Sequence, residues 1–231
     1  MNGAEGAGST WALLVAAGEG ARLGIDRPKA FADLGGRPLL AESLDRLDRC
    51  DWIDAIVVAA PAGWEEPSIL LAEELAATKL VACVTGGATR AESVRAALAE
   101  VEEDALVVLV HDAARPLVDD SVVERVLAPL GEGFNGAVPV LPVADTLKRV
   151  ERGLVVETVE RDGLAGAQTP QAFLAATLRR AFAGDLAGVT DCASAVERAG
   201  GRVATVDGDP RLLKVTTPAD LALVESLLPR P

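Results

Sequence analysis

Short apolar runs alternate with amphipathic segments through the first 130 residues, and this alternation limits the possible folds more than any other feature of the sequence. The predicted strands cover residues 13–17, 53–60, 80–84 and 105–111. The predicted helices between and after them cover residues 37–50, 64–77, 89–101 and 120–130. Continuous apolar strands are typical of a parallel sheet covered by helices on both faces. With 231 residues, the chain is expected to form one α/β domain.

The first predicted strand runs into a glycine-rich loop that carries two cations. Gly18, Gly20 and Gly24 interrupt the apolar run, and Arg22 and Lys29 lie in or just after the loop. Glycine can adopt positive φ and approach a ligand closely, so that successive N–H groups converge on phosphate oxygens. The loop matches neither the dinucleotide fingerprint GxGxxG nor the P-loop. We interpret it as a cradle for a triphosphate, with a plain tight turn as the alternative.

A second glycine pair follows the third predicted strand. Gly86 and Gly87 lead into a helix for which Thr89 is the expected N-cap. The first N–H groups of a helix have no partner within it, so this end suits a phosphate or the edge of a nucleobase. The alternative is a capped helix that simply follows a turn.

An acidic residue follows the most β-like run of the chain. Asp112 leaves the carboxyl end of residues 105–111, where doubly wound sheets bind their ligands, and is therefore the candidate ligand for a divalent cation. Alternatively, Asp112 caps the following turn and pairs with Arg115. His111, the only histidine, is expected to pack or form hydrogen bonds at the strand end and not to act as an acid or base.

Residues 144–160 alternate apolar and polar side chains over two short arms that meet at residues 151–153. This pattern predicts a β-hairpin. Because an isolated hairpin is at best marginally stable, we expect it to lie against a second copy of the chain. The alternative is that it folds back on its own domain.

The remaining residues continue the α/β pattern. Helices are predicted over residues 172–183 and 190–199, the second with Thr190 as a possible N-cap, and strands over residues 202–208 and 212–216. Thr217 and Pro218 begin the last helix as its cap and first residue. Lys214 lies among apolar neighbours, and a lysine there seldom lies deep without an anionic partner.

Composition excludes several classes of function. A net charge of −13 argues against unspecific binding to nucleic acid or to an anionic membrane. Cys50, Cys83 and Cys192 are odd in number and widely spaced, which favours reduced thiols in a cytosol. The N-terminus lacks the basic region of a signal peptide, and no apolar run approaches the roughly 20 residues that span a bilayer. We expect a cytoplasmic protein.

Seven motifs occur together in one order. They are AAGEGARLG with Pro28-Lys29, GGATRAESV, VHDAARP, Asp145-Thr146 with Lys148, QTPQAF after Arg161, Thr190-Asp191, and LKVTTPADL. With them the chain, from about Trp11 to Leu228, closely resembles the 2-C-methyl-D-erythritol 4-phosphate cytidylyltransferase family of the non-mevalonate isoprenoid pathway. The resemblance implies a Rossmann-like nucleotidyltransferase fold, with a mixed, mostly parallel sheet and helices on both faces. It also implies a single domain over residues 1–231, in which residues 142–161 form a protruding β-arm that clasps the partner in a homodimer.

The same resemblance implies transfer of a cytidylyl group from CTP to 2-C-methyl-D-erythritol 4-phosphate, with release of pyrophosphate and with Mg²⁺ as cofactor. By that likeness the nucleotide is held by Ala16, Ala17, Gly18, Gly87 and Ser93, together with Gly20 of the glycine loop, and Asp112 lies near the metal. Arg22 and Lys29 stabilise the transition state, Arg161 and Lys214 position the acceptor, and Arg115, Thr146 and Thr190 lie near it.

Two positions depart from the family pattern. Leu212 stands where the family often has asparagine, and Ala88 stands where some members carry an acid, which leaves backbone groups to bind the cytidine there. The alternative functions are a cytidylyltransferase for another polyol phosphate, such as ribitol 5-phosphate, and a noncatalytic nucleotide-binding module.

Overall fold

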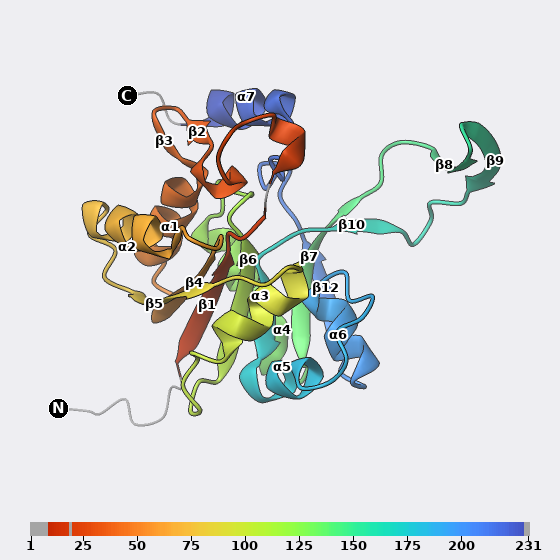
Figure 1. Cartoon of the computed structure of the whole chain (residues 1–231). Helices are drawn as coiled ribbons and strands as arrows, with labels where there is room; N and C mark the ends of the chain where they lie inside the picture. Colours follow the sequence, from red (N-terminus) through yellow and green to blue (C-terminus); the bar gives the residue numbers. More distant parts are fainter. Residues whose placement is uncertain (1–8, 19, 229–231) are drawn as a thin grey trace.

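An eight-stranded mixed sheet forms the centre of the molecule, as the computed structural model shows (Figure 1). The structure describes residues 9–18 and 20–228. The strand order is β10-β7-β11-β6-β1-β4-β5, and β12 also pairs with β7. The parallel half consists of β1 (Thr10–Val15), β4 (Ala55–Ala60), β5 (Leu80–Thr85) and β6 (Val107–Asp112). These strands confirm the predicted apolar runs and the mostly parallel α/β fold.

The other half of the sheet contains β7 (Gly136–Pro142), β10 (Ala165–Ala167), β11 (Gln171–Leu174) and β12 (Val203–Asp207). The predicted helix over residues 172–183 is wrong at its start, because β11 runs antiparallel between β6 and β7 and helix α5 covers only Ala175–Phe182. Ala172 and Phe173 are fully buried and belong to the clusters on opposite faces of the sheet. Successive residues of a helix cannot fill two opposite faces in this way, whereas those of a strand do.

Helices cover both faces of the sheet (Figure 1). One face is covered by α1 (Leu39–Arg49), α2 (Glu65–Glu74) and α4 (Asp120–Gly131), and the other by α3 (Arg90–Leu98), α5 and α6 (Cys192–Arg198). Neighbouring residues of β1 serve the two layers: Leu14 packs in the cluster that contains Leu44, and Leu13 in the cluster that contains Val94. The first four predicted helices are thereby confirmed.

The structure shows which residues are the N-caps of the three helices for which the sequence predicts a cap. Thr89 caps α3 and Thr217 caps α7 (Pro218–Leu227), each in a reciprocal capping box, so both predictions are confirmed. The prediction for α6 is wrong by one residue, because Asp191 and not Thr190 is its N-cap. The carboxylate of Asp191 accepts the N–H of Ser194 at 2.9 Å, and a carboxylate suits the positive end of a helix better than a hydroxyl does.

A third apolar cluster connects the short elements that precede α1 with the C-terminal helix. It joins the 3₁₀ turn η1 (Ala21–Leu23), Ala32 directly after the turn η2 (Lys29–Phe31), Leu34 in the small hairpin of β2 (Asp33–Leu34) and β3 (Arg37–Pro38), and α7. Residues 209–216 pass beside it and are called the strap below. The predicted strand over residues 212–216 is wrong: these residues lie in irregular backbone, which a bond of 2.8 Å from Val215 N to Ala114 O ties to the loop after β6.

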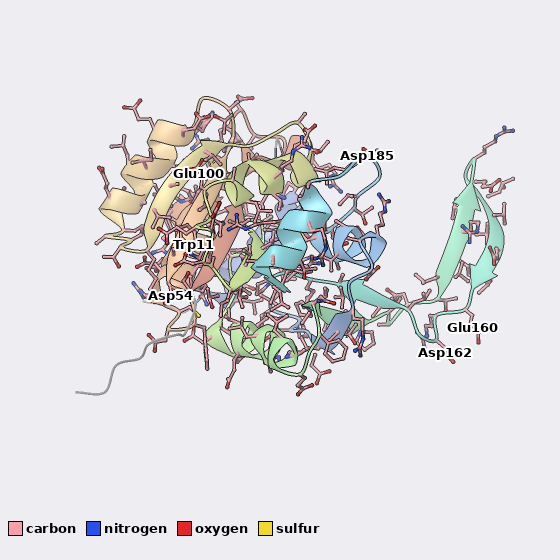
Figure 2. All side chains as sticks on the ribbon, turned by 90° about the horizontal axis from the view of Figure 1, so that it is seen from below. Trp11, Asp54, Glu100, Glu160, Asp162 and Asp185 are labelled. Carbon is pink, nitrogen blue, oxygen red and sulfur yellow. The ribbon has the colours of Figure 1, made fainter. Side chains whose placement is uncertain are left out.

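The hairpin of β8 (Leu147–Glu151) and β9 (Leu154–Val159) projects away from the sheet, and is called the arm below (Figure 1). It confirms the hairpin predicted over residues 144–160. Arg152 and Gly153 turn the chain with φ of 48° and 81°, the positive values that favoured hairpin turns require. Figure 2 shows Glu160 and Asp162 at the foot of the arm, well apart from Trp11 and Asp54 in the body.

Within residues 9–18 and 20–228, no helix is both long and apolar enough to cross a membrane. Cys50, Cys83 and Cys192 are free thiols, and burial raises the pKa of each to about 11. The interpretation of the N-terminus rests mainly on residues 1–8, which lie outside the described residues, as does Glu19 of the glycine loop.

Candidate active site

A cavity of about 430 Å³ opens at the carboxyl ends of β1 and β6. Its walls come from the glycine loop, the start of α3, the turn after β6 and the strap. The lining consists of residues 15–18, 87–90 and 112–114, with Lys29, Ala30, Leu39, Ser93 and Lys214. Adjacent parallel strands end at the same edge of a sheet, which explains how residues from distant parts of the sequence meet here.

Asp112 lies at the centre of the charged groups in this cavity. Its side chain is only 8% exposed, and its two oxygens accept hydrogen bonds from Arg90 Nε at 2.8 Å and Lys214 Nζ at 2.7 Å. Burial raises the pKa of this carboxyl, but the charges of Arg90 and Lys214 outweigh burial and hold the pKa well below its usual range. Lys214 therefore has the anionic partner that its sequence context requires.

The alternative pairing of Asp112 with Arg115 is wrong. Arg115 is half-buried, and its Nη1 donates to the carbonyl oxygen of Leu212 in the strap at 2.6 Å. Its Nη2 lies 3.5 Å from the carbonyl oxygen of Ala167 in β10. Arg115 thus links the turn after β6 to both the strap and the strand that returns from the arm.

Lys29 reaches the cavity from the turn η2. Its Nζ donates to the carbonyl oxygen of Val215 in the strap at 2.9 Å. Burial, and after it the nearby charge of Lys214, lowers the pKa of Lys29 to about 8. Gly20 makes this placement possible: its φ is 71°, and a Cβ built on it would lie 2.5 Å from Cβ of Lys29. A larger residue at position 20 would push Lys29 away from the site.

Backbone and hydroxyl groups form the opposite wall. Ser93 of α3 accepts the N–H of Gly87 at 3.1 Å and donates to the carbonyl oxygen of Thr89 at 2.9 Å, so it fixes the glycine pair against the helix. A Cβ on Gly87 would lie 2.2 Å from Cβ of Glu92, which is why only glycine fits. Ala16, Ala17 and Gly18 continue this wall from the end of β1.

Arg22 and Thr190 lie outside the lining of the cavity, and both are exposed. Arg22 belongs to η1 and is close enough to Lys29 for its charge to lower the pKa of that lysine. Thr190 precedes the cap of α6, in which Asp191 accepts a hydrogen bond from Gln171 at 2.9 Å.

Arg161 and Thr146 also lie outside this cavity, at the foot of the arm, where both are exposed. Arg161 donates from Nη1 to the carbonyl oxygen of Ala144, across the two strands that lead to the arm. The single chain therefore does not bring these two residues to Lys29, Asp112 and Lys214.

Arg90 is the charged residue of this cavity that sequence reasoning missed. Its side chain is 23% exposed; Nε is paired with Asp112, and Nη1 lies 3.6 Å from the sulfur of Cys192. A signal was present, because a cation at the first residue of a helix faces the positive end of the helix dipole. An arginine there indicates an anionic partner elsewhere, which Asp112 supplies.

The cavity thus gathers Lys29, Arg90 and Lys214 around one carboxylate, so its fixed charge is positive inside a chain of net charge −13. Backbone N–H groups and the N-terminus of α3, where Arg90 lies, line the same cavity. This arrangement suits a polyphosphate better than it suits a neutral or cationic ligand.

Comparison with known proteins agrees with this chemistry. The profile of the family described as 2-C-methyl-D-erythritol 4-phosphate cytidylyltransferase (IspD) matches residues 10–230. A protein of that name from Nocardia farcinica is 46% identical over 231 residues, which cover 100% of this chain and 98% of the relative. The crystal structure of the Francisella tularensis enzyme of that name aligns with a TM-score of 0.82 and 30% identity, covering 95% of this chain and 100% of that one. For the Thermus thermophilus structure the TM-score is 0.76 and the identity 36%, with 93% and 96% covered.

Proposed function

The chain belongs to the 2-C-methyl-D-erythritol 4-phosphate cytidylyltransferase family, and we propose that the cavity between β1, α3, β6 and the strap is its catalytic site. The reaction transfers a cytidylyl group from CTP to 2-C-methyl-D-erythritol 4-phosphate and gives 4-diphosphocytidyl-2-C-methyl-D-erythritol and pyrophosphate. The observation that carries the assignment of the site is the meeting of Lys29, Arg90 and Lys214 around Asp112.

The difficulty of this reaction is electrostatic. The acceptor phosphate is already ionised at neutral pH, so its oxygen attacks the α-phosphorus of CTP without a general base. The new O–P bond forms as the bond to the bridging oxygen of pyrophosphate breaks, and the electron pair leaves with pyrophosphate. Negative charge accumulates on the equatorial oxygens and on the leaving group. Cations that are fixed beforehand stabilise this charge without reorganisation.

We assign that role to Lys29 and Arg22. Lys29 is held in the cavity wall by the carbonyl oxygen of Val215, and Arg22 lies on the exposed side of the same loop. The nucleotide is assigned to the opposite wall, where Ala16, Ala17, Gly18, Gly20 and Gly87 offer backbone groups and Ser93 fixes the glycine pair.

Asp112 fits a role as the protein ligand of Mg²⁺. Mg²⁺ in nucleotide enzymes is usually held by one or two carboxylates together with substrate phosphates. Asp112 is an ionised carboxylate in the cavity wall, and the described residues contain no group of three or more potential metal ligands that would compete with it. When bound, the metal ion offsets negative charge on the phosphate oxygens.

The acceptor is assigned to the strap side of the cavity. Lys214 projects from the strap, and Arg115 holds the strap through the carbonyl oxygen of Leu212. The Nε of Arg115 is buried without a hydrogen-bond partner among the described residues. Arg161, Thr146 and Thr190 complete the acceptor site in this proposal, and the first two require the arm of a second copy of the chain.

We therefore propose a homodimer joined through the arm. The arm exposes Val150, Leu154, Val155 and Val156 by 58%, 71%, 62% and 51%. Several large apolar side chains this exposed on one hairpin are typical of an interaction surface. In the same proposal residues 1–231 act as one nucleotidyltransferase domain, residues 142–161 are its dimerisation arm, and the enzyme works in the cytoplasm, whose reducing conditions suit its free thiols.

Pyrophosphate release by the purified protein tests the function. With CTP and Mg²⁺, we expect release with 2-C-methyl-D-erythritol 4-phosphate and little with ribitol 5-phosphate. Equal or faster release with ribitol 5-phosphate would favour another polyol phosphate as the substrate. CTP binding without release on either acceptor would favour a noncatalytic module.

A further inference from the structure

The single histidine of the chain is completely buried behind the cavity, and both of its ring nitrogens are bonded. Nε2 of His111 lies 3.0 Å from the carbonyl oxygen of Arg115, and Nδ1 lies 3.1 Å from the hydroxyl oxygen of Thr169. The same hydroxyl oxygen accepts the backbone N–H of Asp112 at 3.1 Å. These three bonds connect the end of β6 with the segment that precedes β11.

The bonds fit one arrangement of protons. A carbonyl oxygen only accepts, so Nε2 carries the hydrogen and donates it to Arg115. Nδ1 is then the acceptor for the hydroxyl of Thr169, and the hydroxyl oxygen is free to accept from Asp112. Each donor in the chain therefore has an acceptor, and the ring is neutral.

Both ends of the turn formed by residues 112–115 are fixed through this ring. Thr169 holds the backbone of Asp112, and the ring holds the carbonyl of Arg115; a bond of 2.9 Å from Arg115 N to Asp112 O closes the turn between them. The turn carries the carboxylate that pairs with Arg90 and Lys214, and the guanidinium that holds the strap. A shift of the turn would move both charged groups together.

We propose that His111 is a positioning residue: its neutral Nε2–H imidazole and Thr169 hold residues 112–115 so that Asp112 and Arg115 keep their places in the active site. This inference rests on the proposed function of the cavity. The ring is completely buried with both nitrogens bonded within the protein, and the charged groups of Asp112, Arg115 and Arg90 lie around it. Its role is to orient other groups and not to transfer a proton.

Nitrogen NMR tests the proton arrangement directly, because untagged protein labelled with ¹⁵N-histidine gives one set of ring signals. We expect the signals of the Nε2–H tautomer, in which Nδ1 carries no hydrogen. Thr169→Val is expected to shift the Nδ1 signal, because it removes the hydroxyl that Nδ1 accepts. Signals of the Nδ1–H tautomer would overturn the proposal.

Kinetics separate positioning from general support of the fold. His111→Asn keeps an acceptor near Nδ1 and loses the bond to Arg115, whereas His111→Gln keeps a donor near Nε2 and loses the bond to Thr169. We expect His111→Asn to raise KM for the acceptor, and His111→Gln and Thr169→Val to lower kcat, each by about 10- to 100-fold, as small misplacements of reacting groups do. Thr169→Ser should restore kcat.

Leu109→Ala is the matched control, since Leu109 is 1% exposed on the same strand and belongs to a purely apolar cluster. It should lower Tm but leave kcat and KM unchanged well below Tm. Variants of His111 and Thr169 that keep the kcat and KM of the wild type would refute the positioning role. Losses of activity that Leu109→Ala reproduces would also refute it. Failure of the wild type to release pyrophosphate would refute the proposed function instead.

Discussion

In the cavity the charged groups already have partners within one chain, whereas the arm presents apolar side chains without cover. Asp112 is bonded to Arg90 at 2.8 Å and to Lys214 at 2.7 Å, and Lys29 to Val215 at 2.9 Å. Leu154 in the arm, by contrast, is 71% exposed. Under the proposed function, this difference means that the nucleotide half of the site, which contains Lys29 and Asp112, is complete in a single chain, whereas the acceptor half depends on what the arm contacts.

The largest expected effect comes from removing a cation of the nucleotide half. We expect Lys29→Ala or Arg22→Ala to lower kcat by about 10²- to 10³-fold with a smaller change in CTP binding, because fixed donors act mainly on the transition state. Steady-state pyrophosphate release measures this. Lys79→Ala is the control. Lys79 lies directly before β5, and its Nζ donates to the backbone carbonyl oxygen of Cys50. Turnover of the wild-type level in either cavity variant would contradict the assignment.

A charge placed on the arm should weaken the proposed dimer and, with it, the acceptor half of the site. Leu154→Asp is expected to weaken self-association by about 10- to 100-fold, from the roughly 1.5–3 kcal/mol that full burial of a leucine supplies. Sedimentation at several concentrations gives the dissociation constant, and acceptor KM should rise in parallel.

Leu106→Asp provides the comparison for this change, because Leu106 is 54% exposed but lies in the body, directly before β6. It should leave association unchanged. The proposed dimer would be refuted by a Leu154→Asp protein that associates as the wild type does, or by a monomeric wild type.

The pH dependence of kcat/KM sharpens the description of the nucleotide half. The pKa of Lys29 is lowered to about 8, and kcat/KM reports the free enzyme, so kcat/KM for CTP should fall about tenfold per pH unit above about pH 8. Lys29→Arg should move this limb to higher pH, because arginine stays charged. Identical profiles for the two proteins would show that another group titrates.

The same pKa has a consequence for stability with a definite sign. In the unfolded chain Lys29 has an ordinary pKa of 10.5, so between about pH 8 and 10.5 the unfolded state binds more protons than the native state. The contribution of Lys29 therefore makes the fold more stable as pH rises through that window, and the full cost of burying the charge is present below about pH 8. The native fold thus tolerates a free-energy cost to keep the charged Lys29 in the cavity wall. This agrees with the proposed role of Lys29 in stabilising the transition state.

The smallest effect expected is a partial recovery of activity. If the arm completes the partner's site, a mixture of inactive Arg22→Ala and Arg161→Ala proteins should regain about a quarter of wild-type activity, since half of the dimers are hybrids and each hybrid has one intact site. Subunit exchange is verified by mass, and pyrophosphate release is then measured. Two Arg22→Ala preparations mixed in the same way serve as the control. Verified hybrids without recovery would place Arg161 in its own subunit's site.

The sequence predicts the parallel half of the fold well, because its strands and helices can be recognised from the apolar spacing within each segment. Residues 105–111 read as a strand and form most of β6, and the helices after each strand follow from apolar spacing. Residues 172–174 are wrongly predicted as helix because they form a strand that pairs with both β6 and β7. Pairing between segments that are far apart in the sequence leaves no local pattern. Residues 212–216 also look β-like, but the described part of the chain offers them no strand to pair with, and they form irregular backbone instead.

The residues of the candidate site divide in the same way into those with a local sequence signal and those without one. The glycine loop and Asp112 are recognisable because each lies at the carboxyl end of a strand, and the structure brings Lys29, Asp112 and Lys214 into one cavity. Arg90 was overlooked because its partner lies 22 positions away in the sequence. Arg161 was linked to the site by family resemblance alone, and the single chain leaves it at the foot of the arm.

The bond between Lys29 and the carbonyl oxygen of Val215 also affects which solutes the enzyme can ignore. A lysine that is already satisfied by the protein gains little from one chloride or sulfate, because such an ion replaces a single contact and loses its own hydration. A triphosphate offers many oxygens along its length and can compensate several displaced contacts at once. We therefore expect chloride and sulfate to compete only weakly with CTP at Lys29.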